Sequence, residues 1–578
     1  MRHPMKQNVT ETLLSSCKAY LFASVLLFTF PVQAQDQTVG LMRNDPGAYE
    51  GYTLIAPLLH PSVYLINLEG QIVHQWGVSA MFGSTNRLLS DGALLRVSGA
   101  PSAWMDVQGR SGRLEIIEWD GTVRWQYDFV ADTYMLHHDV VPLPNGNLLG
   151  VVWDRQDMDA ITSVGYDPAN LAEDQDEIFS ERIVEFKPIL PDTMEIVWQW
   201  DSWDHLVQDH NPLLSDTYAE RISDHPGLID VNTSVGGDWL HFNALDYNEE
   251  LDVIAVSASY IDEFWIIDHS PSTEEARGDA GGNFGLGGQL LYRWGNPRMY
   301  SAGGEEDQTL HFLHSVLWVS DGLPGAGNLL VFENGVGQPE GNYSTVHELV
   351  LPYMEDSYGD AIWYAQDLDG SFQDPETAWE FSAPGEFYSD FVSGQQRLPN
   401  GNTLIAEGMT GRIFELAAGS NQLIWEYVNP VIQTGPLSQG DPIPPFGPPG
   451  SVRLQNAVFR ALRYGVDFEG FSDKDLSPVG PIELRTTAEI PDRRFELSPS
   501  YPNPFRDRVT LSIQVDEPMH IELDVFNVLG QKVTTLANEF HAVGTYNYVF
   551  NAEALPPGIY LCRATSEFHS STISLIHR

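Results

Sequence analysis

The sequence predicts an all-β protein: a six-bladed β-propeller followed by a small C-terminal β-sandwich. Three observations support this class. A short aromatic phrase recurs along the chain, Gly turns separate apolar runs, and long amphipathic helical patterns are scarce. Repeated short strands with recurring Gly and aromatic residues are typical of propellers, in which one repeat forms one four-stranded blade. An array of β-sandwiches is the alternative, but the linker breaks that such an array needs are missing.

The aromatic phrase consists of a turn, an apolar run and two aromatic residues separated by one position. Its six copies occupy residues 70–76, 121–127, 194–200, 289–294, 377–381 and 422–427. One copy per blade predicts six blades. The copies are unevenly spaced, so some blades carry long loops, and such loops often build functional sites.

A second phrase alternates with the first and predicts hairpins. It is a Gly turn followed by an apolar strand, as in Leu-Pro-Asn-Gly-Asn. The copies occupy residues 90–97, 143–149, 325–332 and 398–405. Asn-Gly between two strand-like runs is a strong hairpin signal, because both residues tolerate positive φ.

The charge balance excludes one class of function. The 578 residues include 80 Asp plus Glu and 30 Lys plus Arg, for a formal net charge of −50. A field of this sign repels phosphates, so we expect no nucleic-acid partner. Disorder is excluded as well, because 42% of the residues are apolar and 15 are Trp.

The N-terminus predicts export. Basic residues precede an apolar run at 19–30, and Val-Gln-Ala at 32–34 offers a cleavage site, so residues 1–34 are predicted to be a signal peptide. A membrane anchor is the alternative, but the run is short for a span. After cleavage we expect no transmembrane anchor. Cys562 then stands alone, which excludes an intramolecular disulfide.

Composition changes after Tyr464 and divides the mature chain. We predict the propeller at 35–464, a polar linker at 465–494 and the sandwich at 495–578. The last part contains Tyr-Pro-Asn-Pro-Phe at 501–505, Val-Phe-Asn-Val-Leu-Gly at 525–530 and Leu-Pro-Pro-Gly-Ile-Tyr at 555–560. In order and spacing these phrases resemble the type A sorting domain of the type IX secretion system. The resemblance implies that this machinery is a partner and that the protein passes through the periplasm to the cell surface or the medium. A generic adhesion sandwich is the alternative.

Histidines mark the candidate site. They occur in three blade-like phrases, at 136–139, 238–243 and 310–314. In a propeller, equivalent strands of successive blades converge on a central channel, so distant histidines can meet there. Histidine there acts as a nucleophile, an acid or base, an anion donor or a metal ligand. Three such residues could also bind zinc, but we expect no metal. The alternative to a functional role is that each histidine only makes structural hydrogen bonds.

An ordered series of phrases then resembles a known family. It comprises residues 137–139 with 143–147, 238–243 with 266–269, 291–297, 331–335 and 396–405. Over most of 45–465 the chain looks like the bacterial arylsulfotransferases (aryl-sulfate sulfotransferases). The resemblance implies a six-bladed propeller that needs no cofactor. The resemblance also implies that the protein moves a sulfuryl group from an aryl sulfate to a histidine and then to a phenolic acceptor.

The resemblance also implies roles for single residues. His314 matches the nucleophile, His241 matches a sulfuryl-binding histidine, and His138 rather than His137 supplies a third catalytic histidine. We also count His137 as a candidate for substrate binding.

The chain departs from the family pattern at one important position. Ser259 stands where the family commonly has Arg, which removes a bidentate anion donor. Arg293 is a candidate replacement for substrate binding, with a structural role as the alternative. This departure keeps a second function open, a non-catalytic secreted propeller that binds a sulfated aromatic or glycan ligand. A quinone-dependent propeller dehydrogenase is disfavoured, because a regular tryptophan-docking repeat is missing.

Overall fold

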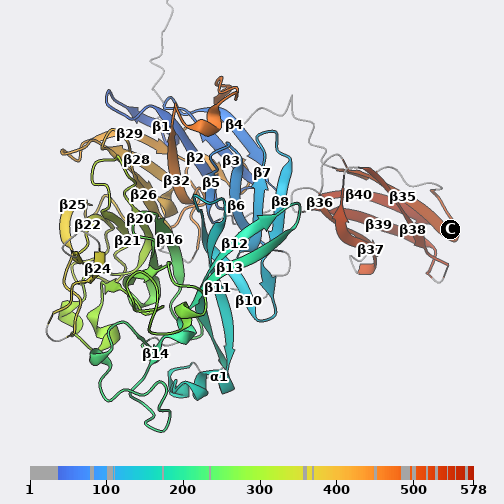
Figure 1. Ribbon diagram of the computed structural model, residues 1–578. Coiled ribbons are helices and arrows are strands. Elements are labelled where there is room, and N and C mark those ends of the chain that lie inside the picture. The colour runs from blue at the N-terminus through green and yellow to red at the C-terminus, as the bar shows by residue number, and fades with distance from the viewer. Residues whose placement is uncertain are drawn as a thin grey trace, which may run out of the picture. The chain divides into compact units, whose positions relative to one another are not determined.

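The computed structural model is an all-β protein, as the sequence predicts (Figure 1). Its α-helix among the described residues is the short α1 (Met158–Ser163). The predicted signal peptide at 1–34 lies outside the described residues. The structure describes residues 37–578 except 79–83, 101–108, 110, 172–174, 234–235, 356–360, 368–369, 448–451, 483–494, 498–502, 516–518, 528–531, 543, 554 and 567–569.

Six antiparallel sheets of four or five strands form the described chain between Gly40 and Pro481. Sheet 1 contains β5 (Asn86–Leu88), β6 (Leu94–Gly99), β7 (Gly112–Ile117) and β8 (Val123–Asp128). Sheet 2 contains β10 (Tyr134–Pro142), β11 (Leu148–Asp157), β12 (Glu177–Ile189) and β13 (Thr193–Asp201), with β9 (Val130–Ala131) beside β10. Sheet 3 contains β16 (Phe242–Asn248), β17 (Val253–Ala258), β18 (Glu263–Asp268) and β19 (Tyr292–Trp294).

The other three sheets complete this part of the chain. Sheet 4 contains β20 (Leu313–Trp318), β21 (Leu329–Glu333), β22 (Thr345–Val350) and β25 (Glu376–Ser382). Sheet 5 contains β26 (Gly394–Arg397), β27 (Thr403–Glu407), β28 (Arg412–Leu416) and β29 (Leu423–Val428), with β1 (Gly40–Asn44) outside β29. Sheet 6 contains β32 (Val458–Gly465), β2 (Gly51–Pro57), β3 (Ser62–Ile66) and β4 (Gln71–Gly77), with β33 (Gly480–Pro481) outside β4.

Three small strand pairs lie outside these six sheets. They are β14 (Leu206–Val207) with β15 (Ile229–Asp230), β23 (Tyr353–Glu355) with β24 (Ala361–Tyr364), and β30 (Val431–Ile432) with β31 (Gly435–Pro436).

The first strand of each sheet packs against neighbouring sheets. We call β5, β10, β16, β20, β26 and β32 the first strands. Strand β10 contacts β6 and β16, β20 contacts β16 and β26, and β26 contacts β32. Sheet 6 in turn contacts sheet 1, through β2 and β5. Each sheet therefore has two neighbouring sheets.

The six aromatic phrases have one structural role. Each lies on the fourth strand of a different sheet, namely β4, β8, β13, β19, β25 or β29. A Trp in each phrase donates its indole N–H to a residue near the start of the fourth strand in the next sheet. The six bonds join Trp76 to Glu118 O, Trp125 to Thr193 O, Trp200 to Gly288 O, Trp294 to Asp374 Oδ1, Trp379 to Asn421 Oδ1 and Trp425 to Leu68 O. The repeat therefore reflects a repeated bond between sheets.

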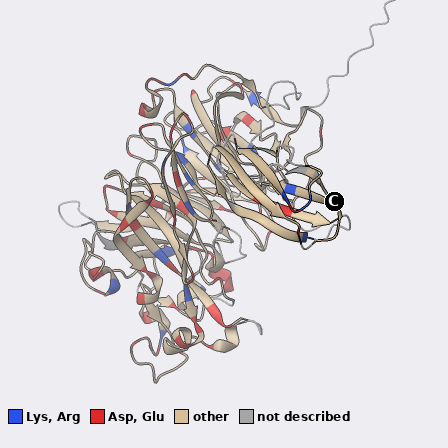
Figure 2. Ribbon diagram, turned by 90° about the vertical axis from the view of Figure 1, so that its right-hand side faces the viewer, with Lys and Arg blue, Asp and Glu red and all other residues tan. Residues whose placement is uncertain are grey.

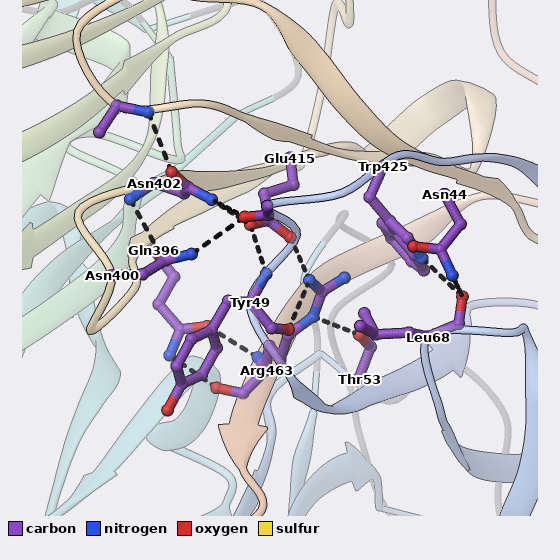
Figure 3. A network of polar contacts seen from close by, with 12 residues as sticks. Asn44, Tyr49, Thr53, Leu68, Gln396, Asn400, Asn402, Glu415, Trp425 and Arg463 are labelled. Carbon is purple, nitrogen blue, oxygen red and sulfur yellow. Dashed lines mark hydrogen bonds and ion pairs between the residues drawn. The ribbon is translucent and has the colours of Figure 1, made fainter.

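Sheets 5 and 6 combine strands from both ends of this part of the chain. Strand β1 pairs with β29, and β32 pairs with β2. A buried polar network supports this junction (Figure 3). The Glu415 carboxylate accepts bonds from Arg463, from Asn402 Nδ2 at 2.6 Å and from the Tyr49 N–H at 2.8 Å. Arg463 also donates to Thr53 Oγ1 at 2.9 Å, so one ion pair ties four segments together.

The predicted linker at 465–494 is ordered in its first half. Strand β33 pairs with β4, Phe471 is buried against a cluster that contains Trp76, and Ile482 is buried as well. These contacts extend the packed region to Ile482. The remainder of the predicted linker, 483–494, lies outside the described residues.

The C-terminal part has its own two sheets and its own core. One sheet contains β34 (Phe495–Leu497), β35 (Arg508–Val515) and β38 (Gly544–Asn551), and the other contains β36 (Met519–Asn527), β37 (Lys532–His541), β39 (Gly558–Thr565) and β40 (Ser570–His577). Alternate residues of β35 are buried, as expected for a strand with one face on a core. Cys562 is buried in that core and forms no disulfide. In the described part of the chain, no helix is long and apolar enough to cross a bilayer.

Candidate active site

Three predicted histidines come together from three adjacent sheets. His138 lies in β10, His241 directly precedes β16, and His314 lies in β20. All three are buried, with at most 1% of each residue exposed. The imidazole centroids of His138 and His241 are 4.6 Å apart. Burial lowers the pKa of both His138 and His314, and the charge of His241 lowers each further, so the three rings share one electrostatic environment.

Local backbone irregularities aim these side chains. His138 and His241 have positive φ angles of 43° and 55°, and Phe312 has 57°. Each adjoins a break in strand register; the breaks fall at 137–140, 242–245 and 313–315. Bulges re-aim side chains next to active sites, and a left-handed non-Gly residue costs about 1–3 kcal/mol. The same irregularity therefore accompanies the histidine phrases in all three sheets.

Asn334 fixes the tautomer of His314, and burial keeps the ring neutral. The Asn334 amide N–H₂ donates to the carbonyls of Ser389 at 2.8 Å and Val392 at 3.1 Å. Its Oδ1 must then face His314 Nδ1, which lies 2.8 Å away, and the ring nitrogen must donate. Burial lowers the pKa of His314 to about 3. The ring is therefore neutral with its lone pair on Nε2, a buried atom without a hydrogen-bond partner in the described structure.

His241 has the opposite electrostatic character. Its Nδ1 lies 2.6 Å from Asp238 Oδ2. Burial lowers its pKa, but the Asp238 carboxylate more than offsets this effect, so the pKa of His241 rises above its ordinary value. Its buried Nε2 has no partner in the described structure. A protonated His241 presents an unused N–H to an anion.

His137 and His138 form a contact with Glu181. His137 Nδ1 lies 2.8 Å from His138 Nδ1, and His137 Nε2 lies 2.8 Å from Glu181 Oε2. The indole ring of Trp153 stacks on His137 at 3.8 Å between centroids. Burial, followed by the charge of His241, lowers the pKa of both histidines well below the ordinary value. His137 thus lies between His138 and Glu181.

Aromatic side chains line the same region. Tyr260 stacks on His241 with centroids 4.3 Å apart and rings nearly parallel, at 5°. Phe391 lies 4.6 Å from His314, and Phe312 lies 5.1 Å from it. Tyr260 is 42% exposed, whereas the histidines are buried. These faces suit a flat aryl group stacked beside the histidines.

A buried cation lies next to this group. Arg460 Nη1 is 3.0 Å from Asp139 Oδ2, and Thr85 donates to Asp139 Oδ1 at 2.5 Å. Arg460 Nε and Nη2 are buried and have no hydrogen-bond partner in the described structure. The charge of Arg460 contributes to the lowered pKa of His314. Acidic residues are spread over many strands and loops (Figure 2). Within this negative protein, Arg460 supplies buried N–H groups near the histidines.

Ser259 and Arg293 have structural surroundings. Ser259 is buried, donates to Leu313 O and accepts from Asn243 Nδ2 at 2.5 Å, so it supports the strand that carries His314. Arg293 lies on the fourth strand β19 and forms a buried bidentate pair with Glu263. The structure does not bring Arg293 to the histidines. The expectation that it replaces the missing Arg is corrected, because its guanidinium is held by Glu263.

A cavity of about 410 Å³ opens at the other ends of the first strands. Its lining includes Arg87, Asp246, Trp318, Arg397 and Tyr464. The histidines do not line it. The candidate site therefore lies apart from this cavity, and we base it on the histidines.

Several site residues were not predicted from the sequence. Asp238 and Asn334 do lie within the phrases that carry the family resemblance, and the Asp-x-x-His spacing was a usable signal for Asp238. Glu181 and Arg460 gave no signal, because each lies in an ordinary strand and reaches the site only through the fold.

Comparisons with known proteins identify the family and the C-terminal domain. Residues 58–429, more than half of the chain, match the arylsulfotransferase (ASST) model. The chain belongs to the arylsulfotransferase family. Residues 500–578 match the secretion system C-terminal sorting domain. This arylsulfotransferase-family protein is therefore exported to the cell surface or secreted. No curated protein matched the sequence.

Similar solved structures are distant. A Bacteroides caccae protein of unknown function shares 11% identity over 72% of this chain and 99% of its own, with a TM-score of 0.37. A Lactobacillus plantarum protein shares 10% identity over 72% and 99%, with a TM-score of 0.33. An inactive variant of virginiamycin B lyase from Staphylococcus aureus shares 9% identity over 68% and 89%, with a TM-score of 0.29.

Proposed function

We propose that this protein is an exported aryl-sulfate sulfotransferase that carries the sulfuryl group on His314. The observation that carries the proposal is the state of His314: a buried, neutral imidazole whose Nδ1 is held by Asn334 and whose Nε2 is unpartnered in the described structure. A neutral imidazole with a free lone pair is a competent nucleophile.

We further propose that the six sheets are the blades of one six-bladed propeller. Two features support this architecture: each sheet contacts two others, and the six indole bonds run from sheet to sheet and return to the first. In this arrangement the first strands surround the axis, which accounts for the meeting of three histidines from three sheets.

In the first half-reaction, His314 Nε2 attacks the sulfur of an aryl sulfate. The N–S bond forms while the bond from sulfur to the aryl oxygen breaks, and a phenol leaves after taking a proton. His241, held cationic by Asp238, donates an N–H to the sulfuryl oxygens. The second half-reaction reverses this chemistry: a phenolic acceptor attacks the sulfur, loses its proton, and frees His314. This order predicts ping-pong kinetics.

Two buried cations compensate for the absent Arg. Ser259 provides no charge, and the whole chain carries −50. His241 and Arg460 each hold unused N–H groups near His314. We propose that together they attract the sulfate ester into an otherwise negative protein.

One assay tests this function. Purified protein is given 4-nitrophenyl sulfate with and without phenol, beside His314→Ala and a control, His225→Ala, which replaces an exposed histidine. We expect phenol-dependent nitrophenol release in the wild type and the control, and none in His314→Ala. Release that survives in His314→Ala would contradict the mechanism.

The second candidate is a non-catalytic propeller that binds a sulfated aromatic or glycan ligand. It is favoured by Ser259, which leaves the site without the family's Arg. Tight binding of 4-nitrophenyl sulfate by calorimetry with no nitrophenol release would support this alternative.

A further inference from the structure

We propose that Glu181, His137 and His138 form a proton relay that protonates the leaving phenol and deprotonates the acceptor phenol. This inference rests on the proposed function, because it assigns the proton that each half-reaction must move. Glu181 and His137 are positioning residues here, and His138 Nε2 is the atom that meets the substrate oxygen.

Two successive short contacts connect Glu181, His137 and His138. The two contacts, Glu181 Oε2 to His137 Nε2 and His137 Nδ1 to His138 Nδ1, are both 2.8 Å long. All three side chains are buried. A contact between two imidazole nitrogens needs one donor and one acceptor, so the tautomer of His137 dictates that of His138.

Two arrangements follow. With Glu181 ionised, His137 Nε2–H donates to the carboxylate, His138 Nδ1–H donates to His137, and His138 Nε2 carries a lone pair. With Glu181 protonated, its O–H donates to His137 Nε2, His137 Nδ1–H donates to His138, and His138 Nε2 carries a proton. One proton on Glu181 thus decides whether His138 acts as an acid or a base.

Surrounding groups hold the carboxyl in a fixed orientation. Trp153 Nε1–H donates to Glu181 Oε1 at 3.1 Å and the Phe242 N–H does so at 2.8 Å. Both bonds use Oε1, so an acidic proton belongs on Oε2, which faces His137. Burial raises the pKa of Glu181 well above its ordinary value; the charge of Asp238 raises it further, and that of His241 opposes this. We therefore assign the resting relay a neutral acid and two neutral rings, a state that the raised pKa of Glu181 and the lowered pKa values of His137 and His138 favour.

The relay gains and loses the same number of protons over the two half-reactions. As the phenolate leaves, His138 Nε2–H is transferred to its oxygen, the His137 Nδ1 proton moves to His138, and the Glu181 proton moves to His137. Glu181 is then a carboxylate. In the second half-reaction the acceptor O–H gives its proton to His138 Nε2, and the reverse shifts return a proton to Glu181. No proton is exchanged with solvent.

The kinetic test uses Glu181→Gln. The amide is expected to keep the shape and donate to His137, but it releases no proton. The matched control is Glu185→Gln on the same strand, where the carboxylate bonds His269, which contacts no other histidine in the described structure. Pre-steady-state phenol release is measured with phenyl sulfate and with 4-nitrophenyl sulfate, whose more acidic phenol needs less protonation.

We expect Glu181→Gln to slow phenyl sulfate about 10²-fold more than 4-nitrophenyl sulfate, and Glu185→Gln to slow both equally. Equal losses with both donors in Glu181→Gln would overturn the relay while leaving the proposed function intact. Absence of turnover in the wild type would overturn both.

A second measurement needs neither activity nor a variant that folds. Imidazole ¹⁵N NMR of the wild type at neutral pH should show the proton of His138 on Nε2. As alkaline titration removes the proton from Glu181, His137 and His138 should change tautomer at the same pH. A His138 proton on Nδ1 at neutral pH would contradict the proposed resting state.

Discussion

His314 Nδ1 lies 2.8 Å from Asn334 Oδ1, and this contact places the lone pair of the neutral imidazole on Nε2. The Asn334 side chain is itself fixed, because its amide nitrogen is held by two backbone carbonyls. A single amide therefore selects the tautomer that nucleophilic attack requires.

Asn334→Ala removes this selection. We expect kcat to fall about 10²-fold, because the ring loses its orientation and its preferred tautomer. Stopped-flow nitrophenol release measures this loss. Retention of full activity would show that His314 does not depend on Asn334.

Asn334→Asp tests the protonation state. The pKa of His314 is about 3, so in the wild type His314 stays neutral and nucleophilic at pH values well above 3. A carboxylate beside Nδ1 would raise this pKa and protonate Nε2 at higher pH. We expect the acid limb of the kcat/KM profile to move to higher pH; an unchanged limb would contradict the assignment.

Asp238→Asn tests the charge of His241. Without the carboxylate, burial lowers the pKa of His241, and the ring is neutral at pH 7. Loss of one charged donor should lower kcat/KM for the aryl sulfate about 10²-fold. Sulfate esters should also lose more affinity than neutral phenols; equal losses for both would indicate a purely structural role.

Gly109→Ala tests the position of His138. Gly109 has φ +82°, and a Cβ there would lie 1.8 Å from the His138 ring. The substitution should displace His138 and lower activity about tenfold or more. Gly121→Ala is the matched control, since it has φ +86° and nothing within 4 Å of the added Cβ. Similar kinetics for the two variants would show that His138 takes no part in the reaction.

Alkaline pH should destabilise the fold through two other histidines. Burial lowers the pKa of each, but flanking carboxylates (Asp252 and Glu185; Glu333 and Glu380) raise it to about 9 in His269 and His347. Because the folded values exceed the ordinary value of about 6.5, this stability is complete below pH ~6.5 and is lost as pH rises through about 9. Tm by calorimetry should fall across that range, and His269→Asn with His347→Asn should flatten the fall. Equal slopes for wild type and variant would refute this origin.

The fold class and the three histidines that we assign to the site could be predicted from the sequence, but the environment of these histidines could not. The aromatic phrases were visible because every sheet needs an indole bond to the next, a requirement that repeats in the sequence. The three histidines stood out because each lies in a distinctive phrase. Glu181 and Arg460 could not be found in this way, because their contacts depend on how separate sheets pack. Arg293 differs from these two residues, because its pairing with Glu263 joins two strands of one sheet and holds its guanidinium away from the histidines.

The sulfohistidine proposal is tested most directly by the mass of the intact protein after brief exposure to 4-nitrophenyl sulfate without an acceptor. We predict an added mass of one SO₃ group on His314, absent in His314→Ala and removed by phenol. An unmodified protein that still transfers sulfate, or a sulfuryl group on another residue, would contradict it.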